Sequence, residues 1–288
     1  MPPIPRELEL QAEALAVSLR PLLVASGRVA ASVTQGIHGR RQSGPGENFW
    51  QFRRYQSGDP AGAIDWRQSA KSDPLYVRET EWAAAQTIWV WPDSSPSMRW
   101  RSRPDLPEKR QRAALLALTT AAVLLQGGER VGVLGGRDAP NAGRGMLPRL
   151  ADAMFDAAGD GRLPDVPVSR QSHVLIFSDF LMPLDSLEAQ LRRWSESGVR
   201  GVLIHLLDPA EITLPYQGHV RFSGLEGEGD LVVPRAEALR DAYGARLGAH
   251  RAALAAMTRA VGWRFLDHGT DAEPREVLIA LHNALAGH

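Results

Sequence analysis

From residue 86 onward, short apolar segments alternate with longer helical patterns, and this alternation constrains the fold more than any other feature of the chain. The apolar segments cover residues 86–91, 130–134, 172–178, 200–207 and 263–266. Helical patterns cover residues 107–126, 147–158, 184–197, 235–261 and 274–286, and a hairpin is expected over 218–234. Strands that alternate with helices predict an α/β, Rossmann-like class: a mostly parallel sheet with helices on both faces.

The first of these strands ends in a loop that is dense in oxygen ligands. Asp93, Ser95 and Ser97 follow it in a D-x-S-x-S pattern, so a carboxylate and two hydroxyls can turn toward one point. Such groups suit a hard cation, Mg²⁺ or Mn²⁺, rather than a soft metal. The alternative interpretation is an ordinary strand-to-helix turn, because Asp and Ser are also favoured as helix caps.

A second acid is expected beside this loop. The third strand leads directly into Asp179, and Asp179 lies next to the Asp93 loop if the first and third strands are neighbours. Ligands of open α/β sheets bind beyond the carboxyl ends of the strands, at a switch point in strand order. Asp208, after the fourth strand, is better explained as a capping acid before Pro209.

The first 85 residues have a different character, and the predicted domain division is 1–85 and 86–288. Residues 7–24 have the spacing of an amphipathic helix that packs on a core, and residues 36–46 form a glycine-rich basic loop. Residues 47–81 interleave aromatics with arginines and acids, which predicts an irregular segment clamped to the main domain. The acids nearly cancel the arginines there, which argues against a single-stranded nucleic-acid surface.

Composition excludes several classes of protein. Lys plus Arg and Asp plus Glu both number 33, so no net charge attracts nucleic acid, and the absence of cysteine excludes thiol chemistry and cysteine-bound metals. The eight histidines form no H-x-x-x-H pair. No signal peptide is visible and no apolar run approaches the roughly 20 residues of a membrane span. We therefore expect a cytoplasmic protein without membrane insertion.

Two stretches carry a resemblance to known families. Arg54-Tyr-Gln-Ser-Gly-Asp-Pro60, Ile64-Asp-Trp-Arg-Gln-Ser-Ala-Lys71 and Tyr76-Val-Arg-Glu79, followed by the Asp93 loop, are similar to the bacterial family called domain of unknown function 58. Lys71 stands where that family usually has Arg. The sheet domain itself resembles the von Willebrand factor A domain. The signature residues are Arg54, Tyr55, Gly58, Asp59, Asp65, Trp66, Arg67, Ser69, Lys71 and Arg78.

The resemblance implies a metal-ion-dependent adhesion site, with Mg²⁺ or Mn²⁺ held by Asp93, Ser95, Ser97 and Asp179, in a short soluble form of the family. It also implies a MoxR-type AAA+ ATPase as partner, with the chain as an adaptor in chaperone-like assembly or maturation of a client that the sequence does not name. The adhesion site usually includes a threonine after the second strand, and no Thr occurs between Arg130 and Val168.

Three functions follow from these patterns. The first is a non-enzymatic module that binds a partner carboxylate through the cation, with residues 47–79 extending the same surface. The second is a metal-dependent phosphoester hydrolase, for which Arg99 and Lys109 are available near the loop. The third is a structural scaffold with a vestigial site. For the first, Asp93→Ala is expected to abolish partner binding and leave the fold intact, because the loop is expected at the surface.

Overall fold

The computed structural model describes residues 6–19, 43–44, 48–56, 59, 62, 64–71, 74–81, 85–143, 145–156, 159 and 161–286. The chain forms two compact units: Met1–Val29 together with Gln86–His288, and Ala30–Ala85. The N-terminal helix therefore groups with the sheet-bearing unit, whereas the sequence-based division placed it with residues up to 85.

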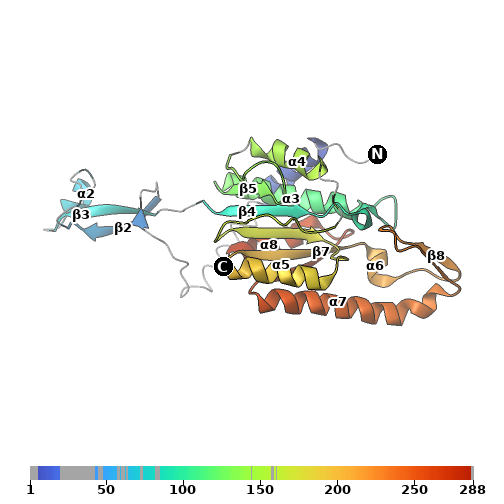
Figure 1. Ribbon diagram of the computed structural model, residues 1–288. Helices are drawn as coiled ribbons and strands as arrows, with labels where there is room; N and C mark the ends of the chain where they lie inside the picture. The colour runs from blue at the N-terminus through green and yellow to red at the C-terminus, as the bar shows by residue number, and fades with distance from the viewer. Residues whose placement is uncertain are drawn as a thin grey trace. The chain divides into compact units, whose positions relative to one another are not determined.

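A five-stranded parallel sheet is the centre of the larger unit (Figure 1). Its strands are β4 (Thr87–Pro92), β5 (Arg130–Val133), β6 (His173–Ser178), β7 (Arg200–Leu207) and β10 (Arg264–Gly269). Their order is β10-β7-β6-β4-β5, so the chain turns to one side of β4 to form β5 and to the other side to form β6. The switch point predicted from sequence thus lies at the ends of β4 and β6.

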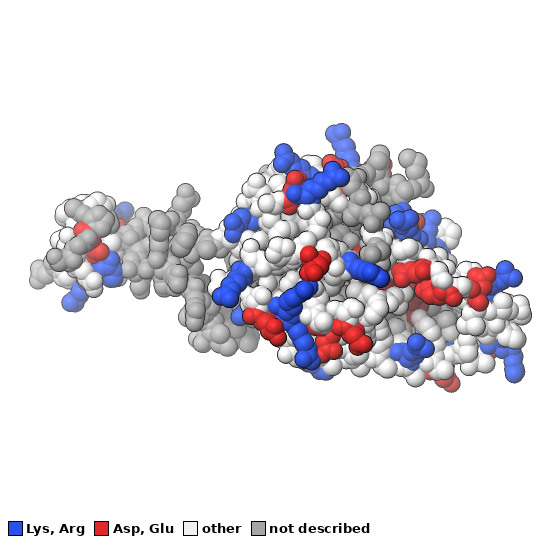
Figure 2. Space-filling view, in the orientation of Figure 1, with Lys and Arg blue, Asp and Glu red and all other residues white. Residues whose placement is uncertain are grey.

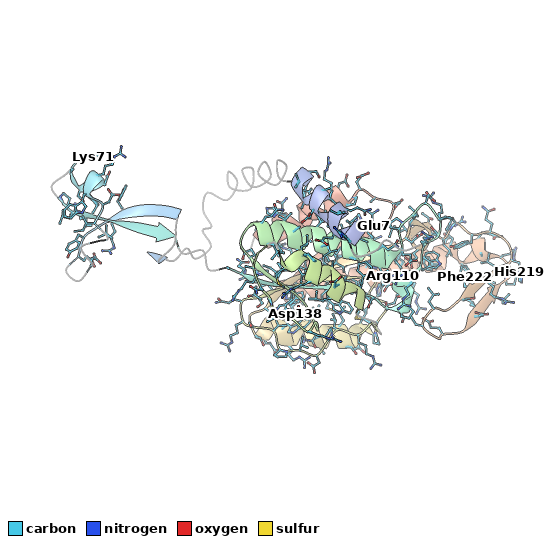
Figure 3. All side chains as sticks on the ribbon, turned by 90° about the horizontal axis from the view of Figure 1, so that it is seen from above. Glu7, Lys71, Arg110, Asp138, His219 and Phe222 are labelled. Atoms are coloured by element: carbon cyan, nitrogen blue, oxygen red, sulfur yellow. The ribbon has the colours of Figure 1, made fainter. Side chains whose placement is uncertain are left out.

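Helices cover both faces of this sheet, as the alternation predicted. One face packs against the N-terminal helix (residues 6–19), α3, α4 and α8, and the other against α5 and α7. In the view of Figure 3 the N-terminal helix, which carries Glu7, lies beside the helices of its face. The helices are α3 (Lys109–Gln126), α4 (Met146–Asp156), α5 (Leu184–Glu196), α6 (Pro209–Thr213), α7 (Arg240–Ala260) and α8 (Pro274–Ala286), with 3-10 turns η2 (Pro96–Arg99) and η3 (Ala236–Leu239).

The expected hairpin is present. Strands β8 (Val220–Ser223) and β9 (Asp230–Val233) pair antiparallel, with Val220 opposite Val233 and Phe222 opposite Leu231. The single helix predicted over 235–261 is instead the turn η3 followed by α7. On the face shown in Figure 2, basic and acidic side chains are interspersed, in keeping with equal numbers of each.

The smaller unit is more regular than the sequence predicted. Its strands are β1 (Ser43–Gly44), β2 (Asn48–Arg54) and β3 (Tyr76–Glu81), joined in the order β1-β3-β2 by antiparallel pairing, with a short helix α2 (Trp66–Ser69). The expectation of an irregular segment was wrong for β2 and β3, because pairing between strands some 20 residues apart is not visible in either strand alone. Most of the predicted loop at 36–46 lies outside the described residues.

Within the described part of the chain, no helix combines the length and the apolar character needed to cross a membrane.

A buried histidine on β10 predicts acid sensitivity of the fold. Burial, with a smaller effect of the Arg112 guanidinium, lowers the pKa of His268 to about 4. In the unfolded chain the imidazole takes up a proton below about pH 6.5, so stability is complete above that pH and is lost as the pH falls toward 4. We expect urea unfolding to show about 2–3 kcal/mol less stability at pH 4.5 than at pH 7 from this residue, at 1.36 kcal/mol per pKa unit.

The variant His268→Gln should reduce that loss, since it removes the titrating group. The same change at the exposed His219 (Figure 3) should leave the pH dependence as it is in the wild type. An equal loss of stability in His268→Gln and in the wild type would contradict the prediction.

Candidate metal centre at the ends of β4 and β6

Asp93 follows β4 directly and is held in one orientation. Its backbone N–H donates to Phe177 O at 2.9 Å, which continues the ladder between β4 and β6. Its Oδ1 accepts from Ser95 N at 2.8 Å and its Oδ2 accepts from Ser178 Oγ at 2.7 Å. The side chain is 2% exposed, so the expectation of a surface loop was wrong for this residue. The carboxylate turns inward because it accepts hydrogen bonds from the backbone of its own loop and from the Ser178 hydroxyl at the end of β6.

The two serines of the D-x-S-x-S pattern lie side by side. Ser95 Oγ and Ser97 Oγ are 3.1 Å apart, and both side chains are buried. Ser97 lies in η2, whose first residue is Pro96, so the proline fixes the turn that brings the second hydroxyl back to the first. Gly161 approaches Ser95 so closely that an added Cβ would lie 3.2 Å from Ser95 Cβ.

The end of β6 supplies the second acid and a strained turn. Ser178 Oγ donates to Asp93 and accepts from Phe180 N at 2.9 Å, so the hydroxyl joins the two loops. Phe180 has φ 53°, in the left-handed region that non-glycine residues rarely adopt, and it is fully buried. This backbone conformation follows immediately after Asp179, and strain of this kind concentrates at functional sites.

Asp179 already has a cationic partner. Lys109 Nζ lies 2.9 Å from Asp179 Oδ2 and 2.5 Å from Glu211 Oε1. Lys109 is 1% exposed and begins α3. Burial alone lowers the pKa of Lys109, but attraction by Asp179 and Glu211 outweighs it and raises the pKa above its ordinary value. The lysine is therefore a buried, charged ammonium beside the candidate metal ligands.

Glu211 is fixed by the short helix α6. Asp208 caps α6, accepting from Ala210 N at 2.8 Å and from Ser102 N at 2.9 Å, in keeping with the capping role expected from sequence. Glu211 Oε2 accepts from Asp208 N at 2.8 Å, which leaves Oε1 for the lysine. The sequence reading missed Glu211 and Ser178, and it considered Lys109 only as a group to grip phosphate.

The residues around Asp93 fit a hard divalent cation. Burial, reinforced by the nearby Asp179 charge, raises the pKa of Asp93, although hydrogen bonds from Ser178 and Ser95 oppose the shift. No Lys or Arg among the described residues forms an ion pair with it, so a bound cation would relieve an uncompensated buried charge. The serine oxygens, 3.1 Å apart, match the spacing of about 3 Å between neighbouring ligands in an octahedral shell with bonds of about 2.1 Å.

Oxygen ligands other than carboxylates would have to complete such a site. No three His, Asp or Glu side chains gather as a ligand group within the described ranges. Asp93 and Asp179 are the two acids available, and Ser95 and Ser97 supply hydroxyls. Asp93, Ser95 and Ser97 are thus brought together, whereas Asp179 accepts a hydrogen bond from Lys109.

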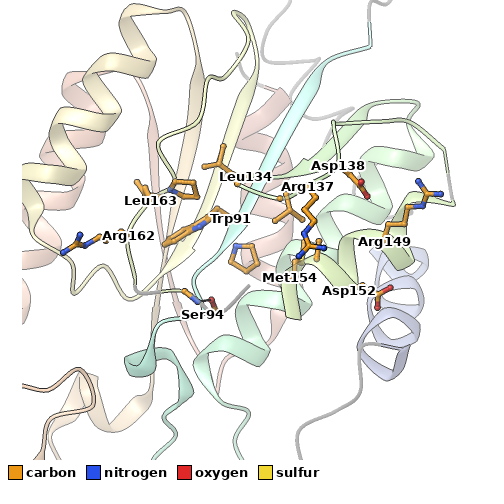
Figure 4. A pocket seen from close by; sticks show the side chains of 17 residues that line it. Trp91, Ser94, Leu134, Arg137, Asp138, Arg149, Asp152, Met154, Arg162 and Leu163 are labelled. Atoms are coloured by element: carbon orange, nitrogen blue, oxygen red, sulfur yellow. Dashed lines mark hydrogen bonds between the residues drawn. The ribbon is translucent and has the colours of Figure 1, made fainter. Parts of the chain in front are cut away.

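A cavity of about 740 Å³ opens beside the loop, between the ends of β4 and β5 and helix α4 (Figure 4). Ser94, between the two candidate ligands Asp93 and Ser95, lines it and accepts from Gly159 N at 2.8 Å. Its lining is apolar at Trp91, Leu134 and Met154 and charged at Arg137, Asp138, Arg149, Asp152 and Arg162. The cavity therefore adjoins the candidate metal centre and offers both apolar and charged contacts.

Several signature residues of the smaller unit hold its turns. Asp59 accepts two hydrogen bonds from the Arg53 guanidinium, at 2.9 and 3.0 Å. It also accepts from Gln56 N at 2.8 Å, which closes the turn. Asp65 caps α2 by accepting from Gln68 N at 2.8 Å, and the buried Ser69 accepts from Tyr76 N at 2.9 Å.

The other signature residues are solvent-facing or outside the description. Arg54, Tyr55, Arg67 and Lys71 are exposed, and Trp66 is 65% exposed. Arg78 lies in β3 opposite Phe52, and its side chain is not among those described. Gly58 lies outside the described residues. The signature thus combines residues that stabilise turns with residues that present an exposed surface.

The fold and the loops at its switch point define a Rossmann-like α/β protein with an acid–serine cluster beyond the strand ends. Residues 51–253 match the family described as protein of unknown function DUF58, and the chain belongs to that family. The resemblance to domain of unknown function 58 that was expected from sequence is confirmed.

Relatives of this chain are bacterial. It is 27% identical over 296 residues to uncharacterized proteins of Mycobacterium tuberculosis and Mycobacterium bovis, covering 95% of this chain and 92% of each relative. Among solved structures, an aerotolerance-related membrane protein from Bacteroides fragilis matches with a TM-score of 0.41 and 13% identity, over 71% of this chain and 100% of that one. The conserved hypothetical protein BatB from Bacteroides thetaiotaomicron matches with a TM-score of 0.39 and 11% identity, over the same shares.

Proposed function

We propose that this protein is a non-enzymatic interaction module, with a domain of the von Willebrand factor A type, that binds a carboxylate of a partner protein through Mg²⁺ or Mn²⁺. The observation that carries the proposal is Asp93, a buried carboxylate without a cationic partner among the described residues, beside two hydroxyls 3.1 Å apart. A cation held there supplies an electrophilic position that a partner's Asp or Glu can occupy.

The residues of the chain have separate roles in this proposal. Ser178 and the Ser95 amide orient Asp93, and Pro96 sets the turn that places Ser97. The resemblance described above suggests a MoxR-type AAA+ ATPase as the partner and an adaptor role in assembly or maturation of a client. The exposed part of residues 47–79 is proposed as a second contact for that partner.

The hydrolase alternative has less support from the site. A phosphoester hydrolase needs a cationic side chain free to grip phosphate, and Lys109 is committed to two acids at 2.5 and 2.9 Å. Of the two cations considered for that role, only Arg99 is left, and it is exposed at the end of η2.

Calorimetric titration of chelator-treated protein with Mg²⁺ and Mn²⁺ tests the first step of the proposal. Saturable binding at one site is expected. The second step is capture of the MoxR-type ATPase of the same organism by the immobilised protein, in Mg²⁺ and in EDTA. Capture in Mg²⁺ alone supports the adaptor role, and equal capture in both conditions contradicts a cation bridge.

The cavity beside the loop provides a separate test of where the partner binds. Ala153 of α4 lines it and is partly buried, and it is not one of the proposed metal ligands, so Ala153→Trp should fill part of the cavity. We expect partner binding to weaken about tenfold, equivalent to about 1.4 kcal/mol, with unchanged calorimetric affinity for Mg²⁺. Ala189→Trp, at an exposed position of α5, is the matched control. Undiminished partner binding by Ala153→Trp would place the contact elsewhere.

A further inference from the structure

The strongest unassigned feature of the larger unit is the buried lysine that joins two strand ends. Lys109 at the start of α3 contacts Asp179 after β6 and Glu211 in α6, which follows β7. Its side chain is 1% exposed, and that of Asp179 is 2% exposed. A cation supplied by the chain itself is therefore already present at Asp179, the second of the two candidate acids.

An ammonium group and a metal ion compete for the same carboxylate oxygen. Lys109 donates a hydrogen bond to Asp179 Oδ2, and an oxygen so engaged has less charge to offer to a divalent cation. Asp179 Oδ1 accepts only a long bond, 3.3 Å, from Leu181 N, so the lysine is its closest partner among the described residues. Engagement of Asp179 by a metal ion therefore opposes its bond to Lys109.

Glu211 provides a second acidic partner for Lys109, so the ammonium stays paired if it leaves Asp179. Its Oε1 lies 2.5 Å from Nζ, and its Oε2 is held by Asp208 N, so the carboxylate stays in place when the lysine moves. A buried ammonium that lost its only acid would be strongly disfavoured. With Glu211 present, Lys109 can release Asp179 and remain paired.

We propose that Lys109 is a built-in competitor for the divalent cation, and that Glu211 sets the cation affinity by accepting Lys109 when Asp179 is released. This inference rests on the proposed metal centre and goes beyond it, because it assigns the control of affinity to two residues that are not metal ligands. The other reading of the same contacts is a structural ion pair that leaves cation binding indifferent to the lysine.

Two single variants have opposite expected effects. Lys109→Met removes the competitor and should tighten Mn²⁺ binding about tenfold, because Asp179 is then free and the local charge is more negative. Glu211→Gln leaves Lys109 with Asp179 as its only acid, so Mn²⁺ binding should weaken about threefold or more. Arg110→Met, at the next residue of α3, where the side chain pairs with Glu108 rather than with the cluster, should change little.

The double variant separates competition from simple electrostatics. If Glu211 acts through Lys109, adding Glu211→Gln to Lys109→Met should no longer weaken Mn²⁺ binding. If Glu211 acts only as a nearby negative charge, it should weaken binding equally in both backgrounds. Double-mutant coupling of this kind isolates a pairwise interaction.

The experiment is calorimetric titration of the full chain with Mn²⁺ for the wild type, the two single variants, the double variant and Arg110→Met, with circular dichroism to verify folding. Tighter binding by Lys109→Met, weaker binding by Glu211→Gln and no effect of Glu211→Gln in the double variant support the inference. Should Lys109→Met fail to fold, Lys109→Gln takes its place in the single and the double variant, and the same outcomes decide.

The inference and the proposed function fail in different ways. Wild-type binding that is matched by both single variants, or an equal effect of Glu211→Gln in both backgrounds, overturns the role of Lys109 and leaves the metal centre standing. Absence of saturable binding in every folded protein overturns both. Binding by Lys109→Met alone supports the lysine as the occupant that keeps the cation out.

Discussion

Asp93→Asn is expected to abolish saturable Mg²⁺ binding and at the same time to stabilise the cation-free fold. The amide retains an oxygen that can accept from Ser95 N, and its NH₂ can donate to Ser178 Oγ, so the hydrogen bonds of the loop have replacements. The negative charge is removed from a side chain that is 2% exposed and whose pKa is raised by burial. Relief of that burial should add about 1–3 kcal/mol to the free energy of unfolding without metal.

Urea unfolding with and without Mg²⁺ measures both effects. The free energy of unfolding of the wild type should rise with Mg²⁺ concentration, because the ion binds the folded state, and that of Asp93→Asn should not change. Asp138→Asn, an exposed acid on the same edge of the sheet, is the control and should behave as the wild type does. An Asp93→Asn protein that is less stable than the wild type in EDTA would mean that the carboxylate serves the fold rather than a ligand.

Lys109→Met should have the largest effect on stability in the absence of metal. Removal of the ammonium leaves the buried Asp179 and the partly buried Glu211 near one another with no cation between them. Breaking a buried ion pair by removing one partner costs about 3–5 kcal/mol, and methionine is of similar length, so little of the loss comes from packing. Chemical unfolding in EDTA gives the value directly.

The double variant Lys109→Met, Asp179→Asn tests the physical reason for this loss. It removes one of the two stranded carboxylates and should recover part of the lost stability. Recovery by Mn²⁺ in Lys109→Met alone is expected as well, since the ion takes up the charge that the lysine neutralised. A loss of less than about 1 kcal/mol in Lys109→Met would show that water or rearrangement already screens these acids, as at an exposed ion pair.

Most of the larger unit could be predicted from sequence because its strands are short, apolar and separated by long helical patterns. The range of β7 and that of α8 coincide with the predicted ranges, and β6 begins one residue later than expected. The strands β4 and β6 are neighbours, as expected, and the proximity of Asp93 to Asp179 depends on this arrangement. Local sequence patterns are sufficient to predict elements of this kind, because the strands are apolar throughout and the helices are long enough to show their period.

The remaining features depend on contacts between distant residues. Lys109 meets Glu211 across more than a hundred positions of sequence, and no local pattern marks a lysine at a helix start as the partner of a later acid. Helix α6 was missed because five residues are too few to show a period. The inward orientation of Asp93 depends on Ser178, which only the pairing of β6 with β4 brings near.

The packing of the N-terminal helix also has a consequence for biosynthesis. Its apolar residues Leu8, Ala12, Ala16 and Leu19 belong to the same core as Val277, Leu278 and Leu281 of α8. During translation the first helix leaves the ribosome long before α8 has been made, so part of its docking surface does not yet exist. Until α8 has been made, the apolar face of this helix therefore remains partly uncovered and is available to holdase chaperones.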